Sequence, residues 1–223
     1  GFDVNYFAKG EKWTCLSDKI VYLVKILNIL KKGKFTHILY TDARDVLYYK
    51  GLFDIIKTFN DNYKGVKLLF NAETNCYPDK SLACKMPNQY KKYKYLNSGV
   101  FIGEIEYTTE IMRRALELYE KFKVKDINFN NDQYIFQLLF LDSNYNEWTL
   151  DYDCKIFQVV WDENGGRSNN FDLIYNHKFI YNQLTDTFPL IFHFPGPTCT
   201  DSQVWKIING KYGRHHGYHN FFK

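Results

Sequence analysis

Apolar residues return every three or four positions in several parts of the chain, a spacing typical of one face of an amphipathic helix. In one such stretch they are Ile20, Leu23, Val24, Leu27 and Leu30. Helices are predicted over residues 20–30, 52–59, 109–122 and 132–141. We expect Ser17 to cap the first helix and Gly33 to end it.

Short runs rich in β-branched and aromatic residues lie between these helices and predict strands. In the first part of the chain they cover residues 2–7, 35–40, 66–70 and 100–102. After Tyr152 they become more frequent, at residues 156–161, 172–175, 179–182 and 190–194. Strands that alternate with helices predict an α/β fold with a mostly parallel central sheet, formed by residues 1–223 as a single domain.

Composition excludes several classes of protein. The chain has 223 residues, 45% of them hydrophobic, which is enough for a sizeable core. A net charge of +4, from 29 basic and 25 acidic residues, is too small to indicate a nucleic-acid partner, although it suits a site for an anionic diphosphate. No apolar run approaches the roughly 20 residues that a membrane span needs. The sequence leaves the oligomeric state open.

Cysteine is present in an odd number, five, as Cys15, Cys76, Cys84, Cys154 and Cys199. No two of them form a C-x-x-C pair, which argues against a zinc ribbon. A disulfide between Cys76 and Cys84 stays open.

Two carboxylates, Asp42 and Asp45, follow directly after the predicted strand at residues 35–40. In open α/β sheets, ligands bind beyond the carboxyl ends of the strands. Two carboxylates on one tight turn can share a divalent cation, which prefers oxygen ligands and offsets the charge of a leaving diphosphate. Spacing alone leaves the alternative open that Asp42 caps the turn and Asp45 pairs with a basic neighbour.

His193 lies at the end of the last predicted strand and is followed by a turn rich in proline and glycine. A single histidine in this position is more often part of the core or surface than a ligand. The turn around Gly196 could present backbone N–H groups to phosphate oxygens.

Further polar residues follow or precede the central strands. Glu73 and Tyr77 follow one strand and Asn97 precedes another, in places suited to binding sugar hydroxyls. Asn131 and Asp132 stand at the start of a predicted helix, where capping is the simplest role and a position facing a sugar donor is the alternative.

Seven segments, in order over nearly the whole chain, resemble the glycosyltransferase domain of the procollagen-lysine hydroxylase/glucosyltransferases. They are residues 10–13, 40–46, 70–78, 95–103, 131–133, 154–158 and 193–198. The run Leu-Asn-Ser-Gly-x-Phe-Ile-Gly at residues 96–103 is specific, whereas the aspartate pair alone is not. The resemblance implies a GT-A (Rossmann-like) fold and a Mn²⁺-assisted, retaining transfer from a UDP-sugar.

The resemblance also implies roles for individual residues. Asp42, Asp45 and His193 match the family's metal ligands. Asn131 and Asp132 match the end of its acidic run and are the catalytic candidates. The candidates for binding the donor are Trp13, Lys19, Arg44, Glu73, Cys76, Tyr77, Asn97 and Gly196.

The chain departs from the family pattern in four places. Arg44 replaces an aromatic residue, so a guanidinium stands where a ring would stack on the nucleotide. Asp132 is the only carboxylate left of the acidic run, and residues 194–197 replace the family's Gly-Asn-Gly-Pro. The chain is also expected to lack the first strand of the nucleotide-binding half.

The function expected from the resemblance is transfer of glucose from UDP-glucose to galactosyl-hydroxylysine of collagen or a collagen-like protein. Two alternatives remain: a hydroxylysine galactosyltransferase that uses UDP-galactose, and a degenerate module that binds collagen without turnover. The abundance of Asn, Lys, Ile, Tyr and Phe is typical of an AT-rich genome and would suit a giant-virus collagen glucosyltransferase.

Overall fold

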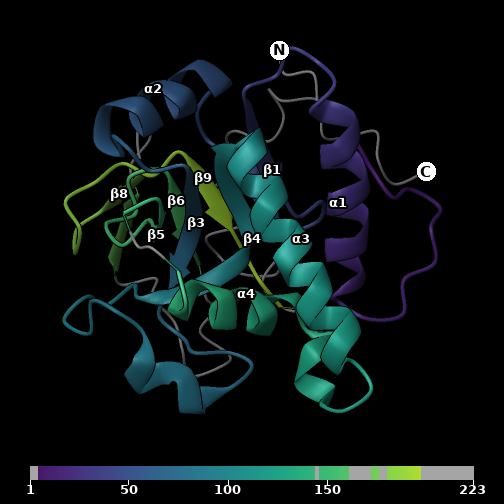
Figure 1. Cartoon of the computed structure of the whole chain (residues 1–223). Coiled ribbons are helices and arrows are strands. Elements are labelled where there is room, and N and C mark those ends of the chain that lie inside the picture. Colours follow the sequence, from purple (N-terminus) through teal and green to yellow (C-terminus); the bar gives the residue numbers. More distant parts are fainter. Residues whose placement is uncertain (1–4, 144–145, 161–171, 176–179, 197–223) are drawn as a thin grey trace. The chain divides into compact units, whose positions relative to one another are not determined.

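A computed structural model describes residues 5–143, 146–160, 172–175 and 180–196 (Figure 1). The chain forms two compact units. Val4–Tyr40 and Gly65–Leu150 make one, called here the α/β unit. Gly1–Asp3, Thr41–Lys64 and Asp151–Lys223 make the other, called the β-rich unit.

The α/β unit is built on a four-stranded sheet in the order β1-β4-β3-β5. Its strands are β1 (His37–Thr41), β3 (Leu68–Glu73), β4 (Tyr95–Glu104) and β5 (Trp148–Leu150). Strand β3 runs antiparallel to β4 and parallel to β5. The sheet is therefore mixed, which corrects the expectation of a mostly parallel sheet.

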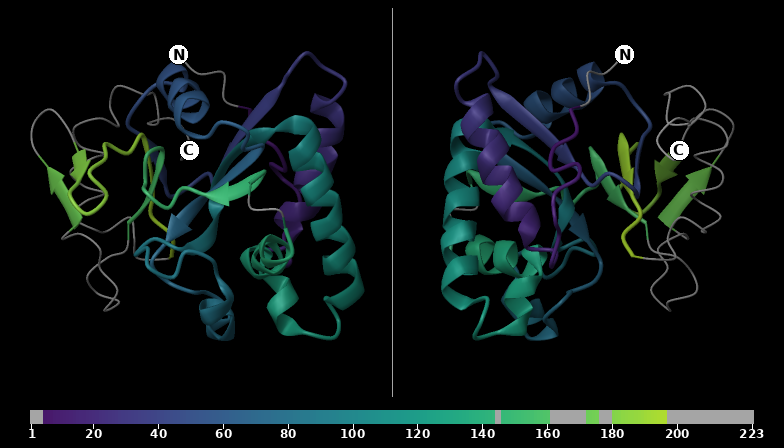
Figure 2. Two further views of the ribbon diagram at one scale, coloured as in Figure 1. Left: turned by 60° about the vertical axis from the view of Figure 1, so that its left-hand side comes forward. Right: turned by 90° about the vertical axis from the view of Figure 1, so that its right-hand side faces the viewer.

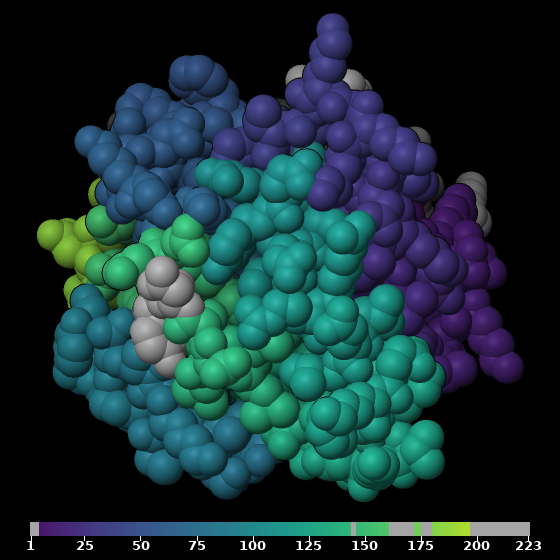
Figure 3. Space-filling model, in the orientation of Figure 1, coloured from purple at the N-terminus to yellow at the C-terminus, as the bar shows by residue number. Residues whose placement is uncertain are grey.

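Three α-helices and two 3-10 helices complete this unit. They are α1 (Asp18–Leu30), α3 (Ile105–Phe122), α4 (Asp132–Leu141), η1 (Lys80–Lys85) and η2 (Ile127–Asn130). Helices α1 and α3 lie side by side (Figures 1 and 2), and their outer faces form neighbouring purple and teal surfaces in Figure 3. Among the described residues, no helix is long and apolar enough to cross a membrane.

Aromatic rings fill the centre of the α/β unit. The ring of Phe70 stacks on that of Phe101 at 4.8 Å, and it also contacts Phe136 at 5.3 Å and Trp148 at 5.5 Å. These four side chains come from β3, β4, α4 and β5 and are fully buried. Burial of such large rings stabilises the sheet and fixes α4 against it.

The β-rich unit holds a three-stranded sheet in the order β2-β9-β6, with bounds β2 (Val46–Tyr48), β6 (Phe157–Val159) and β9 (Ile191–His193). It also holds α2 (Leu52–Asn62) and the antiparallel pair β7 (Leu173–Tyr175) and β8 (Ile180–Asn182). The described residues of this unit include a buried hydrophobic cluster made of Leu47, Val160, Leu173, Ile180, Phe192 and Phe194. The buried carboxylate of Asp151 accepts the backbone N–H groups of Lys155, Ile156 and Phe157, and so fixes the start of β6.

Several predicted elements differ from the structure. Residues 5–7 form no strand, and residues 2–4 of that prediction lie outside the described part. The Ser17 side chain does not cap α1, since its hydroxyl donates to the carbonyl oxygen of Phe129 at 2.6 Å. Asp18 ties the start of α1 instead, by accepting from the backbone N–H of Cys15 at 3.2 Å. The three-residue strands β2 and β5 were not predicted.

Candidate functional site

The residues predicted to form the site fall into two groups, one in each unit, and each group has its own geometry. Asp42, Asp45 and His193 belong to the β-rich unit. Their ligand atoms all lie within 4.8 Å of one another, which is close enough for one ion to contact all three. The structure therefore brings these three residues together in a group able to hold a metal.

Strand pairing explains how the group forms from residues so far apart in sequence. Strand β2 runs antiparallel to β9 with Val46 opposite His193. The backbone N–H of Phe194 donates to the carbonyl oxygen of Asp45 at 2.7 Å, which places Asp45 beside the histidine. On the other side, β6 holds β9 through the bond from the Val160 N–H to the His193 carbonyl oxygen at 2.8 Å. His193 is thus fixed by backbone contacts with both neighbouring strands.

The chemistry of this group suits a cation. His193 is 2% exposed, and neither of its ring nitrogens has a hydrogen-bond partner among the described residues. Its Nε2 atom lies 3.7 Å from Oδ2 of Asp45, too far for a hydrogen bond, and Oδ1 of Asp45 is equally unsatisfied within the described part. Buried polar atoms are rarely left without a partner. A divalent ion bound by the imidazole and the carboxylates would satisfy these atoms.

The α/β unit contains a second polar cluster, centred on Glu73 at the end of β3. Glu73 is 1% exposed and Asn97 is 3% exposed. One carboxylate oxygen of Glu73 accepts from the side-chain amide of Asn97 at 3.1 Å and from that of Gln133 at 2.9 Å. The structure therefore brings two of the predicted donor-binding residues into direct contact.

Gln133 is a further member of this cluster and was not among the site residues predicted from the sequence. Its amide nitrogen also donates to the carbonyl oxygen of Tyr77 at 2.8 Å, and its amide oxygen accepts from the backbone N–H of Ser98 at 3.1 Å. Its position directly after Asn131 and Asp132 was the one available signal.

Lys19 and Asp132, predicted to act at the diphosphate and at the sugar, form an ion pair at 2.8 Å. The two side chains are 9% and 3% exposed, so the pair is buried. The Lys19 ammonium also lies 5.5 Å from the centre of the Tyr40 ring. Asn131 caps α4, because its side-chain oxygen accepts from the backbone N–H of Gln133 at 3.0 Å.

The remaining candidates are placed as follows. Trp13 is half-exposed and packs on Tyr22, with ring centres 5.2 Å apart. Tyr77 is 50% exposed, and Arg44 is exposed on the turn between the two aspartates. Gly196 has a φ of 99°, a backbone conformation that favours glycine. The motif's last residues, 197 and 198, lie outside the described residues.

Cys76 and Cys84 are both free thiols, so the structure does not form the disulfide that the sequence left open. Cys76 is buried and its thiol lies 3.2 Å from the carbonyl oxygen of Asp79. Burial, with the nearby charges of Glu73 and Asp79, raises the pKa of the Cys76 thiol to about 11. The thiol therefore stays protonated at neutral pH and does not act as a nucleophile there.

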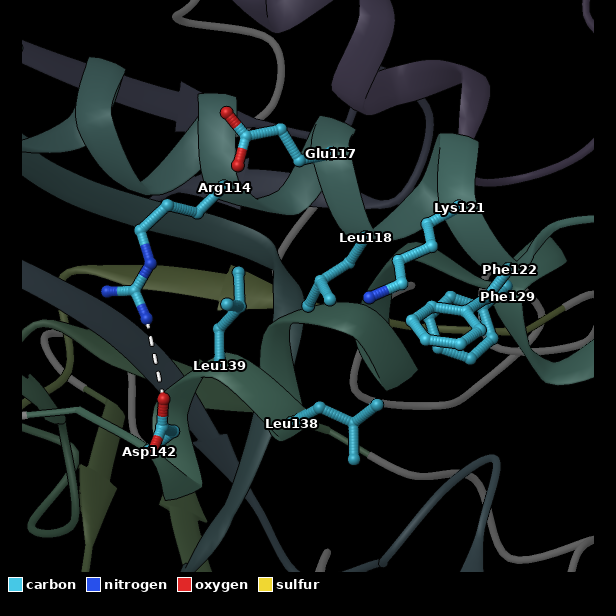
Figure 4. Close-up of a pocket in the computed structure, with 9 residues that line it drawn as sticks. All are labelled: Arg114, Glu117, Leu118, Lys121, Phe122, Phe129, Leu138, Leu139 and Asp142. Atoms are coloured by element: carbon cyan, nitrogen blue, oxygen red, sulfur yellow. Dashed lines mark ion pairs between the residues drawn. The ribbon is translucent and has the colours of Figure 1, made fainter.

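An open groove between α3 and α4 contains none of the predicted site residues (Figure 4). Its lining consists of Arg114, Glu117, Leu118, Lys121, Phe122, Phe129, Leu138, Leu139 and Asp142. Arg114 and Asp142 form an ion pair across it at 3.6 Å.

Comparisons with known proteins agree with the resemblance seen in the sequence. Residues 5–207 match the family described as the PLOD GT domain. An uncharacterized protein of Acanthamoeba polyphaga mimivirus, R699, is 30% identical over 198 residues, which cover 85% of this chain and 39% of that protein. The human multifunctional procollagen lysine hydroxylase and glycosyltransferase LH3 is 32% identical over 211 residues, covering 88% of this chain and 26% of LH3. The chain thus spans less than half the length of these relatives.

Solved structures show the same kind of fold. An active-site mutant of LgtC superposes with a TM-score of 0.53 at 16% identity, covering 93% of this chain and 71% of that one. Galactosyltransferase LgtC in complex with donor and acceptor sugar analogues gives a TM-score of 0.50, also at 16% identity, over 87% of this chain and 67% of that one. The α/β fold is therefore similar to that of GT-A glycosyltransferases. On the match over residues 5–207, the chain belongs to the PLOD GT domain family of glycosyltransferases.

Proposed function

We propose that the chain is a Mn²⁺-dependent, retaining glycosyltransferase that moves glucose from UDP-glucose to galactosyl-hydroxylysine of collagen or a collagen-like protein. The observation that carries the proposal is the group of Asp42, Asp45 and His193, in which a buried imidazole has neither nitrogen satisfied among the described residues. Membership of the PLOD GT domain family and the names of its collagen-modifying members support the choice of acceptor.

Each group of side chains has a role in this proposal. A divalent cation bound by Asp42, Asp45 and His193 would act as a Lewis acid and offset the charge of the leaving diphosphate. Gly196 and the turn after His193 contribute backbone N–H groups to the phosphate oxygens. Trp13 packs near the uridine, and Arg44 supplies a guanidinium where relatives of this type place an aromatic ring.

At the sugar, Lys19 contributes positive potential toward the diphosphate, and Asp132 with Asn131 stabilises positive charge that develops at the anomeric carbon. Because Lys19 and Asp132 form a buried ion pair, we expect them to act together. Glu73, Cys76, Tyr77 and Asn97 shape the pocket for the sugar. The bond from the anomeric carbon to the diphosphate breaks as the bond to the acceptor oxygen forms, and the departing phosphate oxygen takes the acceptor's proton.

A donor and acceptor screen with mass detection tests this function. Peptides that carry hydroxylysine or galactosyl-hydroxylysine are incubated with UDP-glucose or UDP-galactose and Mn²⁺. The proposal expects one hexose to be added to the galactosylated peptide from UDP-glucose. Addition from UDP-galactose to bare hydroxylysine would show a galactosyltransferase instead. Peptide binding without UDP release at any Mn²⁺ concentration would show a non-catalytic collagen-binding module.

A further inference from the structure

The side chain of Gln133 makes three hydrogen bonds, and two backbone groups determine how its amide is oriented. The Ser98 N–H can only donate, so the atom of Gln133 that faces it must be the amide oxygen. The Tyr77 carbonyl can only accept, so the atom that faces it must be the amide nitrogen. The Gln133 side chain therefore has one possible orientation, and in that orientation it presents N–H to Glu73.

Asn97 is oriented in the same way. Its side-chain oxygen accepts from the backbone N–H of Gly99 at 3.0 Å, so its amide nitrogen must face Glu73. The pairing of β3 with β4 shifts between Phe70 and Asn71, and the irregular stretch of β4 includes Ser98 and Gly99. The same irregularity of the sheet thus supplies both backbone N–H groups that orient the two amides.

Two oriented amides therefore donate to the same carboxylate oxygen of Glu73. Donors aimed at a carboxylate favour its ionised form and fix its direction. Such an arrangement also needs no reorganisation when charge develops nearby, which is the basis of electrostatic preorganisation.

We propose that Gln133 is a positioning residue for sugar transfer, which acts by holding the Glu73 carboxylate in its orientation at the proposed donor pocket. The inference rests on the proposed function. It assigns Gln133 no contact with substrate, only an effect through Glu73.

Helix α4 offers a matched control. Gln137 is buried like Gln133 and also donates to the Tyr77 carbonyl oxygen, at 3.0 Å, and to that of Leu96, at 3.3 Å. Both of these hydrogen bonds go to backbone, whereas Gln133 also donates to the Glu73 carboxylate. If Gln133 mattered only by holding the segment at Tyr77, the loss of Gln137 would have a similar effect.

The experiment compares steady-state kinetics of four variants with UDP-glucose: Gln133→Leu, Gln137→Leu, Glu73→Gln, and the double variant Gln133→Leu/Glu73→Gln. We expect Gln133→Leu to lower kcat about 100-fold, as small misplacements in active sites do, with KM for UDP-glucose changed less than about threefold. Gln137→Leu should stay within about threefold of the unmodified chain in kcat. The double variant should be no slower than Glu73→Gln alone, because residues that act through one another are not additive.

Two results would overturn the inference in an active enzyme: an equal loss of kcat in Gln133→Leu and Gln137→Leu, or losses that multiply in the double variant. If Gln133→Leu does not fold, Gln133→Met, which keeps the unbranched length, replaces it throughout. If the unmodified chain transfers no sugar from any UDP-sugar, the proposed function itself fails and this inference falls with it.

Discussion

At the scale of single residues, the two buried carboxylates Asp132 and Glu73 differ in the groups that contact them. Asp132 has a cation, Lys19, at 2.8 Å, whereas Glu73 is held by neutral amide donors at 3.1 Å and 2.9 Å. Breaking a buried ion pair leaves an uncompensated charge, which costs far more than the pair's net contribution. This difference makes the ion pair the better target for a stability measurement.

Lys19→Met should lower the free energy of unfolding by about 3–5 kcal/mol, because Asp132 would stay buried without its cation. The double variant Lys19→Met/Asp132→Leu should recover most of that loss, since it removes both charges. Chemical denaturation with urea measures both. A cost below about 1 kcal/mol for Lys19→Met, as for an exposed pair, would contradict the buried arrangement.

The resemblance pointed to Asp42, Asp45 and His193 as one group, whereas spacing alone left their roles open. The contact itself depends on the pairing of β2 with β9, and β2 is too short to be predicted from the sequence. Asp42, Asp45 and His193 are together as expected. Gln133 could not be found in this way, because its role depends on backbone N–H and C=O groups that lie 35 and 56 positions away. Every residue type carries a backbone C=O group and nearly every type an N–H group, so hydrogen bonds to distant backbone leave no recognisable pattern in the sequence.

At the scale of elements, close packing between β3, β4 and α3 constrains the sheet. A side chain at Gly103 would place its first carbon 2.6 Å from the Thr108 hydroxyl, 2.7 Å from a Leu68 methyl and 2.9 Å from the Lys67 carbonyl oxygen. The last of these is backbone and cannot rotate away. Gly103 therefore permits the close approach of strands that a larger residue would prevent.

Gly103→Ala should destabilise the protein by about 1–3 kcal/mol through overpacking. Gly51→Ala is the comparison variant, since its added carbon would meet nothing within 4 Å and only the N-cap of α2 changes, at a cost of no more than about 1 kcal/mol. Thermal or urea unfolding of the two variants compares them. If the two variants were equally stable, β3 and β4 would be less tightly packed at Gly103 than the structure shows.

The longer helices were predicted, although α3 begins at Ile105 and not at Thr109, whereas the shortest strands were missed. Helix α4 has the bounds predicted, Asp132–Leu141, because Asn131 caps its start and mostly apolar residues continue to Leu141. Strands β2 and β5 have three residues each, too few for a pattern. The antiparallel pairing of β3 with β4 was missed because an apolar buried strand reads the same in either direction.

At the scale of the whole molecule, the family assignment rests on a match over residues 5–207, and the α/β fold agrees with it. The chain spans 26–39% of the relatives described here. The matched residues 5–207 include Asp42, Asp45 and His193 and also the Glu73 cluster.

The most direct test is sugar transfer by the Asp45→Ala variant with UDP-glucose and Mn²⁺, with Mn²⁺ affinity measured on the same sample by calorimetry. We expect loss of Mn²⁺ binding and a fall in turnover of at least about 100-fold. Asp54→Ala, which removes an exposed carboxylate from α2, should leave both values unchanged. Full activity in Asp45→Ala, or unchanged Mn²⁺ affinity, would contradict the assignment of Asp42, Asp45 and His193 as the metal site.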